Sequence, residues 1–306
     1  MKISMIGAGR VGATAAFSVL TQGLCDSFAF VDVLGDLARG EALDLLHGVS
    51  LLPRQVKMAG GDDYVLSKDS DVVIITAGIP RQPGETRLDL LKKNVGLMKD
   101  VVAKVVAQSP NAVLIMVSNP VDALTYLAAR ESKFPTSRVV GTGTLLDSVR
   151  FRSFLGDRLG LVSSQVQAYM IGEHGDSMVP VLSQLRVDGI PLTSFPGFAG
   201  KINEILERTK NGGAEVIALK KGTMYPVGLM IARIARAIVF DSGEILPVST
   251  VIDDYYGIRN VALSVPTRIG RGGALERIKL ELSDDELEKL RKSAQVLRSA
   301  LDSVGY

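Results

Sequence analysis

The first half of the chain alternates short apolar runs with segments of helical periodicity, and this pattern restricts the fold more than any other feature. The apolar runs predict strands at residues 2–7, 28–33, 56–60, 71–78, 112–120 and 138–143. The clearest helical patterns cover residues 10–22, 36–48 and 87–108. Continuous apolar strands separated by helices are typical of a parallel sheet covered on both faces. The sequence therefore predicts an α/β fold with a doubly wound parallel sheet.

The second half has a different character. It contains long helical patterns at residues 200–221 and 226–241, a turn signal at 187–191 between two strand-like pieces, and a capped closing helix at 283–301. A chain of 306 residues is long enough for two domains. We predict a nucleotide-binding domain over residues 1–143 and an α+β domain for substrate binding and oligomerisation over residues 144–306.

The composition excludes several classes of protein. The net charge is only +2, with basic and acidic residues interspersed, so nucleic acid is not an expected partner. The single cysteine cannot form an internal disulfide and has no companion for a zinc site, and no metal site is predicted. The sequence shows no export signal and no apolar run of membrane-spanning length. We therefore expect a cytoplasmic protein without a membrane partner.

A glycine-rich segment, GAGRVG, follows the first predicted strand and opens a helix. Gly7, Gly9 and Gly12 would let the backbone turn and approach a pyrophosphate at the helix N-terminus. The next strand ends at Asp32, twenty residues after Gly12, where a carboxylate binds the ribose hydroxyls of NAD and repels the 2′-phosphate of NADP. The alternatives to dinucleotide binding are that these glycines serve only packing and that Asp32 caps a helix.

The chain has only two histidines, which narrows the search for an acid–base group. His47 lies among leucines on a helix and is expected to be structural, whereas His174 lies between glycines and acids in GEHGDS. Histidine suits proton exchange at neutral pH and needs a carboxylate to hold its tautomer. Asp147 is a candidate for that carboxylate, and Arg150 follows three residues later. From spacing alone, such a pair is commonly just an ordinary ion pair within a helix.

Several motifs together resemble the lactate/malate dehydrogenase family over essentially the whole chain. They occur in the order and at about the spacing of that family, and they are GAGRVG, FVDV, AGIPRQPGETRLDLL, VSNPVD, GTLLDSVRFR and GEHGDS. The resemblance implies a Rossmann domain that binds NAD, followed by an α+β domain.

The resemblance also implies a role for each matching residue. His174 would be the proton donor and acceptor, with Asp147 as its partner. Arg150 would bind the C1 carboxylate of the substrate through two prongs, which suits a guanidinium. Arg87 would polarise the C2 carbonyl, and Asn119 would orient the substrate. The implied cofactor contacts are Gly7, Gly9, Arg10, Gly12, Asp32, Asn94, Val117 and Asn119.

The loop that carries Arg81 and Arg87 resembles the lid of this family, which closes over the substrate. Arg81 occupies the position at which malate dehydrogenases have arginine and lactate dehydrogenases have glutamine. Thr223, which would line the substrate pocket, instead matches the threonine that lactate dehydrogenases have at this position. We expect the charge of Arg81 to select the substrate more strongly than the hydroxyl of Thr223, which tolerates several substrates. The sequence therefore predicts an L-malate dehydrogenase of the tricarboxylic acid cycle, which acts on malate and oxaloacetate. The alternative is an L-lactate dehydrogenase.

Three further expectations concern assembly and regulation. The family forms dimers or tetramers, and a homotetramer is the favoured prediction. Arg152 matches an arginine that binds fructose 1,6-bisphosphate in some bacterial relatives, but Gln167 replaces the accompanying histidine, so activation by that ligand is not expected. A non-catalytic NAD-binding sensor is the alternative from another class, and it would not need the residues predicted for catalysis.

Overall fold

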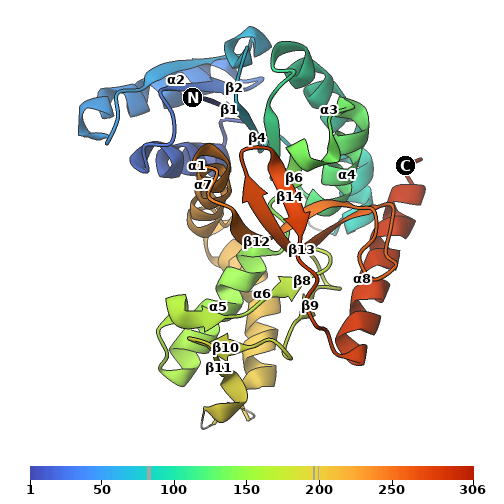
Figure 1. Ribbon diagram of the computed structural model, residues 1–306. Helices are drawn as coiled ribbons and strands as arrows, with labels where there is room; N and C mark the ends of the chain where they lie inside the picture. Colours follow the sequence, from blue (N-terminus) through green and yellow to red (C-terminus); the bar gives the residue numbers. More distant parts are fainter. Residues whose placement is uncertain (81–83, 196, 199) are drawn as a thin grey trace.

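The computed structural model describes residues 1–80, 84–195, 197–198 and 200–306, and it confirms the predicted α/β fold (Figure 1). Each apolar run of the first half forms a strand, and each long periodic segment forms a helix. The elements of this half are β1 (Lys2–Ile6), α1 (Arg10–Thr21), β2 (Ser27–Val31), α2 (Gly35–His47), η1 (Val49–Leu51), β3 (Lys57–Gly61), η2 (Tyr64–Ser67), β4 (Val72–Ile75), α3 (Arg87–Gln108), β5 (Val113–Met116), α4 (Val121–Ser132), η3 (Thr136–Arg138) and β6 (Val139–Gly141).

The first six strands form a parallel sheet in the order β3-β2-β1-β4-β5-β6. This is the strand order of a Rossmann fold, and its switch point lies between β1 and β4. Ligands of such sheets bind outside the carboxyl ends of the strands at the switch point. The fold therefore directs attention to the residues that follow β1, β2, β4 and β5.

Those residues are the tails of the predicted strands. The apolar run at 112–120 forms a strand only as far as Met116, and the run at 71–78 only as far as Ile75. Beyond these points the chain leaves the sheet at its carboxyl edge. The predicted strands were too long because an apolar run does not by itself mark where pairing within the sheet ends.

The second half adds helices and antiparallel strands. Its elements are α5 (Leu145–Leu159), η4 (Ser163–Gln165), β7 (Val166–Gln167), β8 (Met170–Ile171), β9 (Val179–Pro180), β10 (Arg186–Val187), β11 (Ile190–Pro191), η5 (Leu192–Ser194), α6 (Ile202–Lys220), α7 (Tyr225–Val239), β12 (Glu244–Ile252), β13 (Val261–Gly270), β14 (Gly273–Arg277) and α8 (Asp284–Asp302). The predicted turn at 187–191 joins β10 to β11, which pair antiparallel. The long strands β12 and β13 were not individually predicted, since their nearly continuous burial hides the alternation that marks an exposed strand.

Strand β12 joins the two halves of the molecule. It pairs antiparallel with β6 through Ser249 and Gly141, and β13 and β14 continue the same sheet to nine strands. One sheet therefore includes strands from both sides of residue 143. The division of the chain into domains 1–143 and 144–306 stays a prediction.

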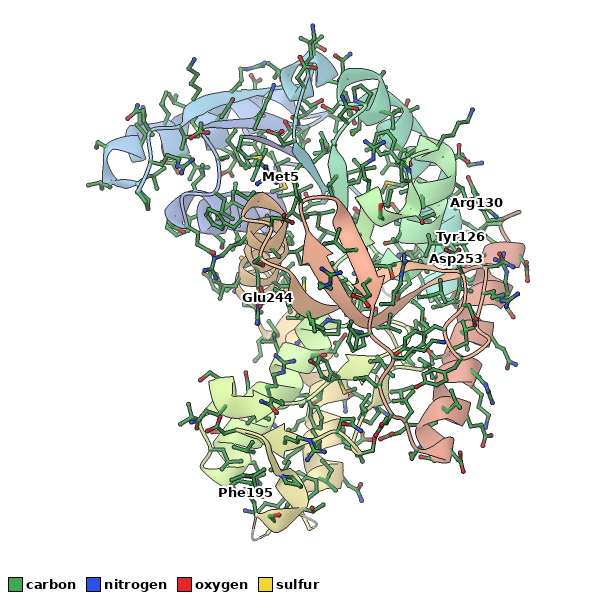
Figure 2. All side chains as sticks on the ribbon, in the orientation of Figure 1. Met5, Tyr126, Arg130, Phe195, Glu244 and Asp253 are labelled. Carbon is green, nitrogen blue, oxygen red and sulfur yellow. The ribbon has the colours of Figure 1, made fainter. Side chains whose placement is uncertain are left out.

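The hydrophobic core lies on both faces of this sheet. Helices α1, α2 and α7 cover one face, with α1 and α7 side by side, and α3, α4 and α8 cover the other (Figure 1). A third cluster packs β10 and η5 against α5 and α6. Figure 2 shows the labelled Met5 within the upper sheet and Phe195 in this lower cluster. The lower cluster supports the helix that carries Asp147 and Arg150.

Two predicted helix starts are confirmed by their capping geometry. Thr86 and Asp89 form a reciprocal capping box ahead of α3, and Ser283 and Glu286 form another ahead of α8. Such caps satisfy amides that the helix leaves unpaired, and each stabilises a helix by about 1 kcal/mol. Pro120 is the N-cap residue of α4.

Candidate active site

Three glycines form a tight turn between β1 and α1. Gly7 has φ of +107°, and a Cβ on Gly12 would lie 2.0 Å from the Gly7 carbonyl oxygen, so both positions require glycine. A Cβ on Gly9 would meet no atom of the described chain within 4 Å. Helix α1 begins at Arg10 without a side-chain cap from Gly9. The turn thus leaves backbone amides and the N-terminus of α1 accessible beside Gly9, an arrangement that suits a pyrophosphate.

Asp32 lies beside this turn, directly after β2. Its Oδ2 accepts a hydrogen bond from the amide of Ala8 at 2.7 Å, and its Oδ1 accepts one from Leu34 at 2.9 Å. These bonds fix the carboxylate at the edge of the glycine turn, where it remains partly exposed. Each carboxylate oxygen can accept a further hydrogen bond. The position fits the ribose of a dinucleotide whose pyrophosphate lies on the turn.

His174, Asp147 and Arg150 form a compact charged cluster. The Nδ1 atom of His174 lies 2.6 Å from Oδ2 of Asp147, and Nη1 of Arg150 lies 3.4 Å from Oδ1 of the same carboxylate. Asp147 is only 2% exposed, whereas 25% of the His174 side chain is exposed. The buried carboxylate thus holds the ring while the ring itself reaches solvent. The structure brings His174, which spacing alone did not connect to Asp147, against the Asp147–Arg150 pair.

The electrostatics of this cluster favour a charged imidazole. Burial by itself would lower the pKa of His174, but the negative charge of Asp147, its hydrogen bond and the charge of Asp122 raise that pKa above its ordinary value. Burial would raise the pKa of Asp147, yet His174 and Arg150 hold it below its ordinary value. Burial also lowers the pKa of the Arg150 guanidinium. The pair is therefore poised as carboxylate and imidazolium.

A cavity of about 620 Å³ joins this cluster to the glycine turn. On one side it is bounded by Val11 in the first turn of α1 and by Val117 and Asn119 after β5. On another it is bounded by the side of α6. Ile79, Pro80, Leu90 and Ser118 line the wall from within the quoted motifs, although no role was predicted for them. The wall residues outside those motifs for which no role was predicted are Thr76, Met178, Lys210, Asn211, Gly213, Ala214 and Ile217. Their periodicity marks the latter only as ordinary parts of strand ends and helices.

Asn94 is fully buried and its side chain is engaged by backbone groups. Its Oδ1 accepts from the amide of Ile79 at 2.8 Å, and its Nδ2 donates to the carbonyls of Ile79, Leu90 and Asn119, each at 3.2 Å. These bonds tie the start of the loop after β4 to the backbone of Asn119. Asn94 therefore shapes the cavity from behind its wall.

The remaining predicted residues lie in varied places. Arg81 lies outside the described residues, and Arg87 begins α3. Thr223 is partly buried between α6 and α7, and it is not among the described residues that line the cavity. Arg10 donates to the carbonyl of Lys220 at 3.4 Å, which links α1 to the end of α6. Arg152 donates to the carbonyl of Ala168 at 2.9 Å.

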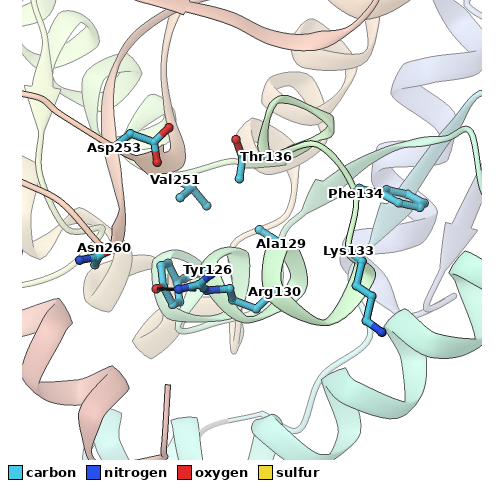
Figure 3. Close-up of a pocket in the computed structure, with 9 residues that line it drawn as sticks. All are labelled: Tyr126, Ala129, Arg130, Lys133, Phe134, Thr136, Val251, Asp253 and Asn260. Atoms are coloured by element: carbon cyan, nitrogen blue, oxygen red, sulfur yellow. Dashed lines mark hydrogen bonds between the residues drawn. The ribbon is translucent and has the colours of Figure 1, made fainter.

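A second cavity, of about 280 Å³, lies at the other end of α4 (Figure 3). Arg130 there donates to the hydroxyl of Tyr126, and Asp253 and Asn260 line the same cavity from the connection between β12 and β13. The two cavities lie toward opposite ends of α4. The described residues that line the second cavity include none of those predicted for the site.

Comparison with known proteins places this geometry in a family. Residues 1–141 match the NAD-binding domain of the lactate/malate dehydrogenases, and residues 144–305 match the α/β C-terminal domain of the same enzymes. The chain belongs to the lactate/malate dehydrogenase family. It is an NAD-dependent oxidoreductase with a Rossmann-like domain, and its substrate is a small hydroxy or oxo acid.

Individual members of this family match along nearly their whole length. The chain is 42% identical to an L-lactate dehydrogenase of Kosmotoga olearia, covering 99% of this chain and 96% of the relative. It is 41% identical to a malate dehydrogenase of Chlorobium luteolum, covering 97% and 96%. The crystal structure of a minor L-lactate dehydrogenase from Enterococcus mundtii, in a ligand-bound form, matches with a TM-score of 0.94 and 36% identity over 99% and 98% of the two chains.

These relatives correct one prediction. Most of the similar curated enzymes are named L-lactate dehydrogenase, as is the matching crystal structure, so the prediction of an L-malate dehydrogenase is wrong. That prediction depended on the charge of Arg81. A guanidinium on a loop selects a dicarboxylate only if the closed loop directs it at the substrate, and sequence does not record that direction.

In the described part of the chain, no helix is long and apolar enough to cross a membrane.

Proposed function

We propose that this chain is an L-lactate dehydrogenase, which reversibly reduces pyruvate to L-lactate. The observation that supports this most directly is the His174–Asp147 pair beside Arg150, in one cavity with the glycine turn. The names of most similar enzymes support the choice of pyruvate within the family.

The proposed chemistry divides between cofactor and protein. Bound NADH supplies the hydride that reduces the C2 carbonyl. The protonated imidazole of His174 donates a proton to the carbonyl oxygen, and we assign this exchange to Nε2 because Nδ1 is engaged by Asp147. Asp147 holds the ring orientation and stabilises the imidazolium. In the reverse direction, neutral His174 accepts the hydroxyl proton of lactate.

Substrate orientation falls to the neighbouring side chains. Arg150 is proposed to bind the C1 carboxylate, and the buried position of its guanidinium strengthens such a charge-assisted pair. Asn119 lines the same cavity and is proposed to orient the substrate oxygen. Arg87, at the start of α3, is proposed to stabilise the charge that develops on that oxygen.

The test is steady-state NADH oxidation with pyruvate and with oxaloacetate on one enzyme sample. We expect kcat/KM for pyruvate to exceed that for oxaloacetate by about tenfold or more, because a site that receives a methyl group leaves a second carboxylate without a partner. A preference for oxaloacetate would contradict the proposal. Binding of NADH without turnover of either acid would instead identify a non-catalytic NAD-binding protein.

The assembly is also proposed. Phe17 on α1, Leu43 on α2 and Leu229 on α7 are each more than half exposed, and exposed apolar side chains support a homo-oligomer. A homotetramer is the assembly that we propose. Sedimentation equilibrium would test this, and a monomeric mass would contradict it. A cytoplasmic location stays a prediction.

A further inference from the structure

Three successive backbone amides hold His174 in place. The amide of Gly172 donates to the carbonyl of Ser264 on β13 at 2.9 Å, and the amide of Glu173 donates to Oγ of Ser293 on α8 at 2.8 Å. The amide of His174 itself donates to Oδ2 of Asp122 at 2.7 Å. The segment is therefore fixed to a strand and to two helices.

Asp122 also reaches a second catalytic element, through Ser264, the residue whose carbonyl receives the Gly172 amide. Its Oδ1 accepts from the hydroxyl of Ser264 at 3.3 Å, and Oγ of Ser264 accepts from the amide of Thr144 at 3.1 Å. Thr144 is the N-cap residue of α5, the helix that carries Asp147. One carboxylate thus connects the His174 segment to the start of the helix that holds its partner.

We infer that Asp122 is a positioning residue, which fixes the His174 backbone relative to α5 and whose charge stabilises the His174 imidazolium. The inference rests on the proposed acid–base role of His174. Asp122 is 2% exposed, and a carboxylate, which only accepts hydrogen bonds when ionised, matches the two donors that face it. A buried carboxylate is costly unless its hydrogen bonds are satisfied, and here both oxygens have partners.

Among the described residues, charged groups on two helices act on the pKa of His174. Asp147 and Arg150 belong to α5 and Asp122 to α4, and Asp147 and Asp122 raise the His174 pKa while Arg150 opposes them. Burial raises the pKa of Asp122 to about 6 and Glu173 acts in the same direction, whereas hydrogen bonds from Ser249 and from the His174 amide and the charge of His174 lower it. Both oxygens of Asp122 accept hydrogen bonds, as those of an ionised carboxylate do.

Asp122→Asn and Asp122→Ala separate the two parts of this role. Asparagine retains an acceptor oxygen for the His174 amide but removes the charge, whereas alanine removes both. The chain has only two histidines, so NMR with labelled histidine can follow His174 directly, with exposed His47 as internal reference. In Asp122→Asn we expect the His174 pKa to fall by about half a unit or more, because a nearby negative charge has gone.

Turnover tests the positioning part. We expect Asp122→Ala to lower kcat with pyruvate by about tenfold or more, with the KM for NADH within about twofold, and Asp122→Asn to restore most of that kcat. Glu131→Gln removes a carboxylate from the other end of α4 and should leave both readouts unchanged. An unmoved His174 titration in Asp122→Asn, or an undiminished kcat in Asp122→Ala, would each overturn the inference.

If Asp122→Ala does not fold, the titration of Asp122→Asn still decides the inference. The titration is also independent of the substrate. A failure of the unmodified protein to reduce pyruvate would contradict the proposed function, while the His174 titration would still report on Asp122.

Discussion

The glycine turn and the catalytic pair are built in opposite ways. The turn and its carboxylate come from two adjacent strands, with Ala8 and Asp32 only 24 positions apart. The catalytic segment is held by contacts between residues far apart in the chain. Asp122 accepts a hydrogen bond from the amide of His174, 52 positions away, and Ser293 accepts one from the amide of Glu173, 120 positions away. At the cofactor end, the bond between Ala8 and Asp32 therefore joins two adjacent strands, whereas at the substrate end the His174 segment is anchored to elements far away in the sequence.

This difference implies that the two ends can be perturbed separately. A change at the turn should alter cofactor affinity and leave the acid–base step intact. A change at the catalytic pair should alter turnover and leave cofactor affinity intact. The predictions that follow test that separation, from the largest expected effect to the smallest.

His174→Gln should lower kcat for pyruvate reduction by about 10³-fold or more, since a general acid typically contributes 10²–10⁴-fold and no second histidine lies in the described cavity. The dissociation constant of NADH, measured by fluorescence, should stay within about twofold. A large loss of NADH affinity would show that the two ends are coupled.

Asp147→Asn should lower kcat/KM by about 100-fold at neutral pH and shift its pH dependence. The raised pKa of His174 keeps the ring protonated above its ordinary range, so pyruvate reduction is present below that pKa and is lost as pH rises through it. Removing the Asp147 charge leaves burial to lower the pKa, and the alkaline limb should move to lower pH. A pH profile of kcat/KM for both proteins provides the test, and coincident limbs would contradict it.

Arg150→Lys should lower kcat/KM for pyruvate by about 10- to 100-fold, because an ammonium replaces a two-pronged guanidinium and one charge-assisted hydrogen bond is worth about 1.5–3 kcal/mol. Arg158→Lys is a matched control on the same helix, where the arginine forms an exposed ion pair with Glu204. Steady-state kinetics of both variants would separate substrate binding from a general effect on α5. Equal losses would argue against the role of Arg150.

Asp32→Asn should weaken NADH binding by about tenfold and reduce discrimination against NADPH, since the carboxylate that repels a 2′-phosphate has gone. At saturating NADH, kcat for pyruvate should stay within about threefold. Isothermal titration with both cofactors, followed by kinetics at saturation, provides the measurement. A kcat that falls along with the affinity would contradict the separation of the two ends.

Sequence reasoning succeeded where structure is local. The alternation of strands and helices, the glycine turn and the capped start of the helix at Ser283 each depend on residues close together in the chain. The proximity of His174 to Asp147 was reached through family resemblance and not through spacing. Its physical cause, the packing of the segment after β8 against the start of α5, has no local sequence signature.

The features that sequence reasoning missed share a different cause. Asp122 resembles an ordinary first-turn aspartate, and only the structure shows that it is buried and bound to the His174 amide. The substrate prediction failed for a related reason. The type and charge of Arg81 were evident, but specificity depends on where a side chain points when the loop closes.

The continuous nine-stranded sheet has a consequence for the molecule as a folding unit. Because β12 pairs with β6, each half taken alone would leave one strand of this pair without its partner. A fragment that ends at residue 143 would expose β6 to edge-to-edge association. The intact chain should then melt in a single cooperative transition, and proteolysis should release no stable N-terminal core.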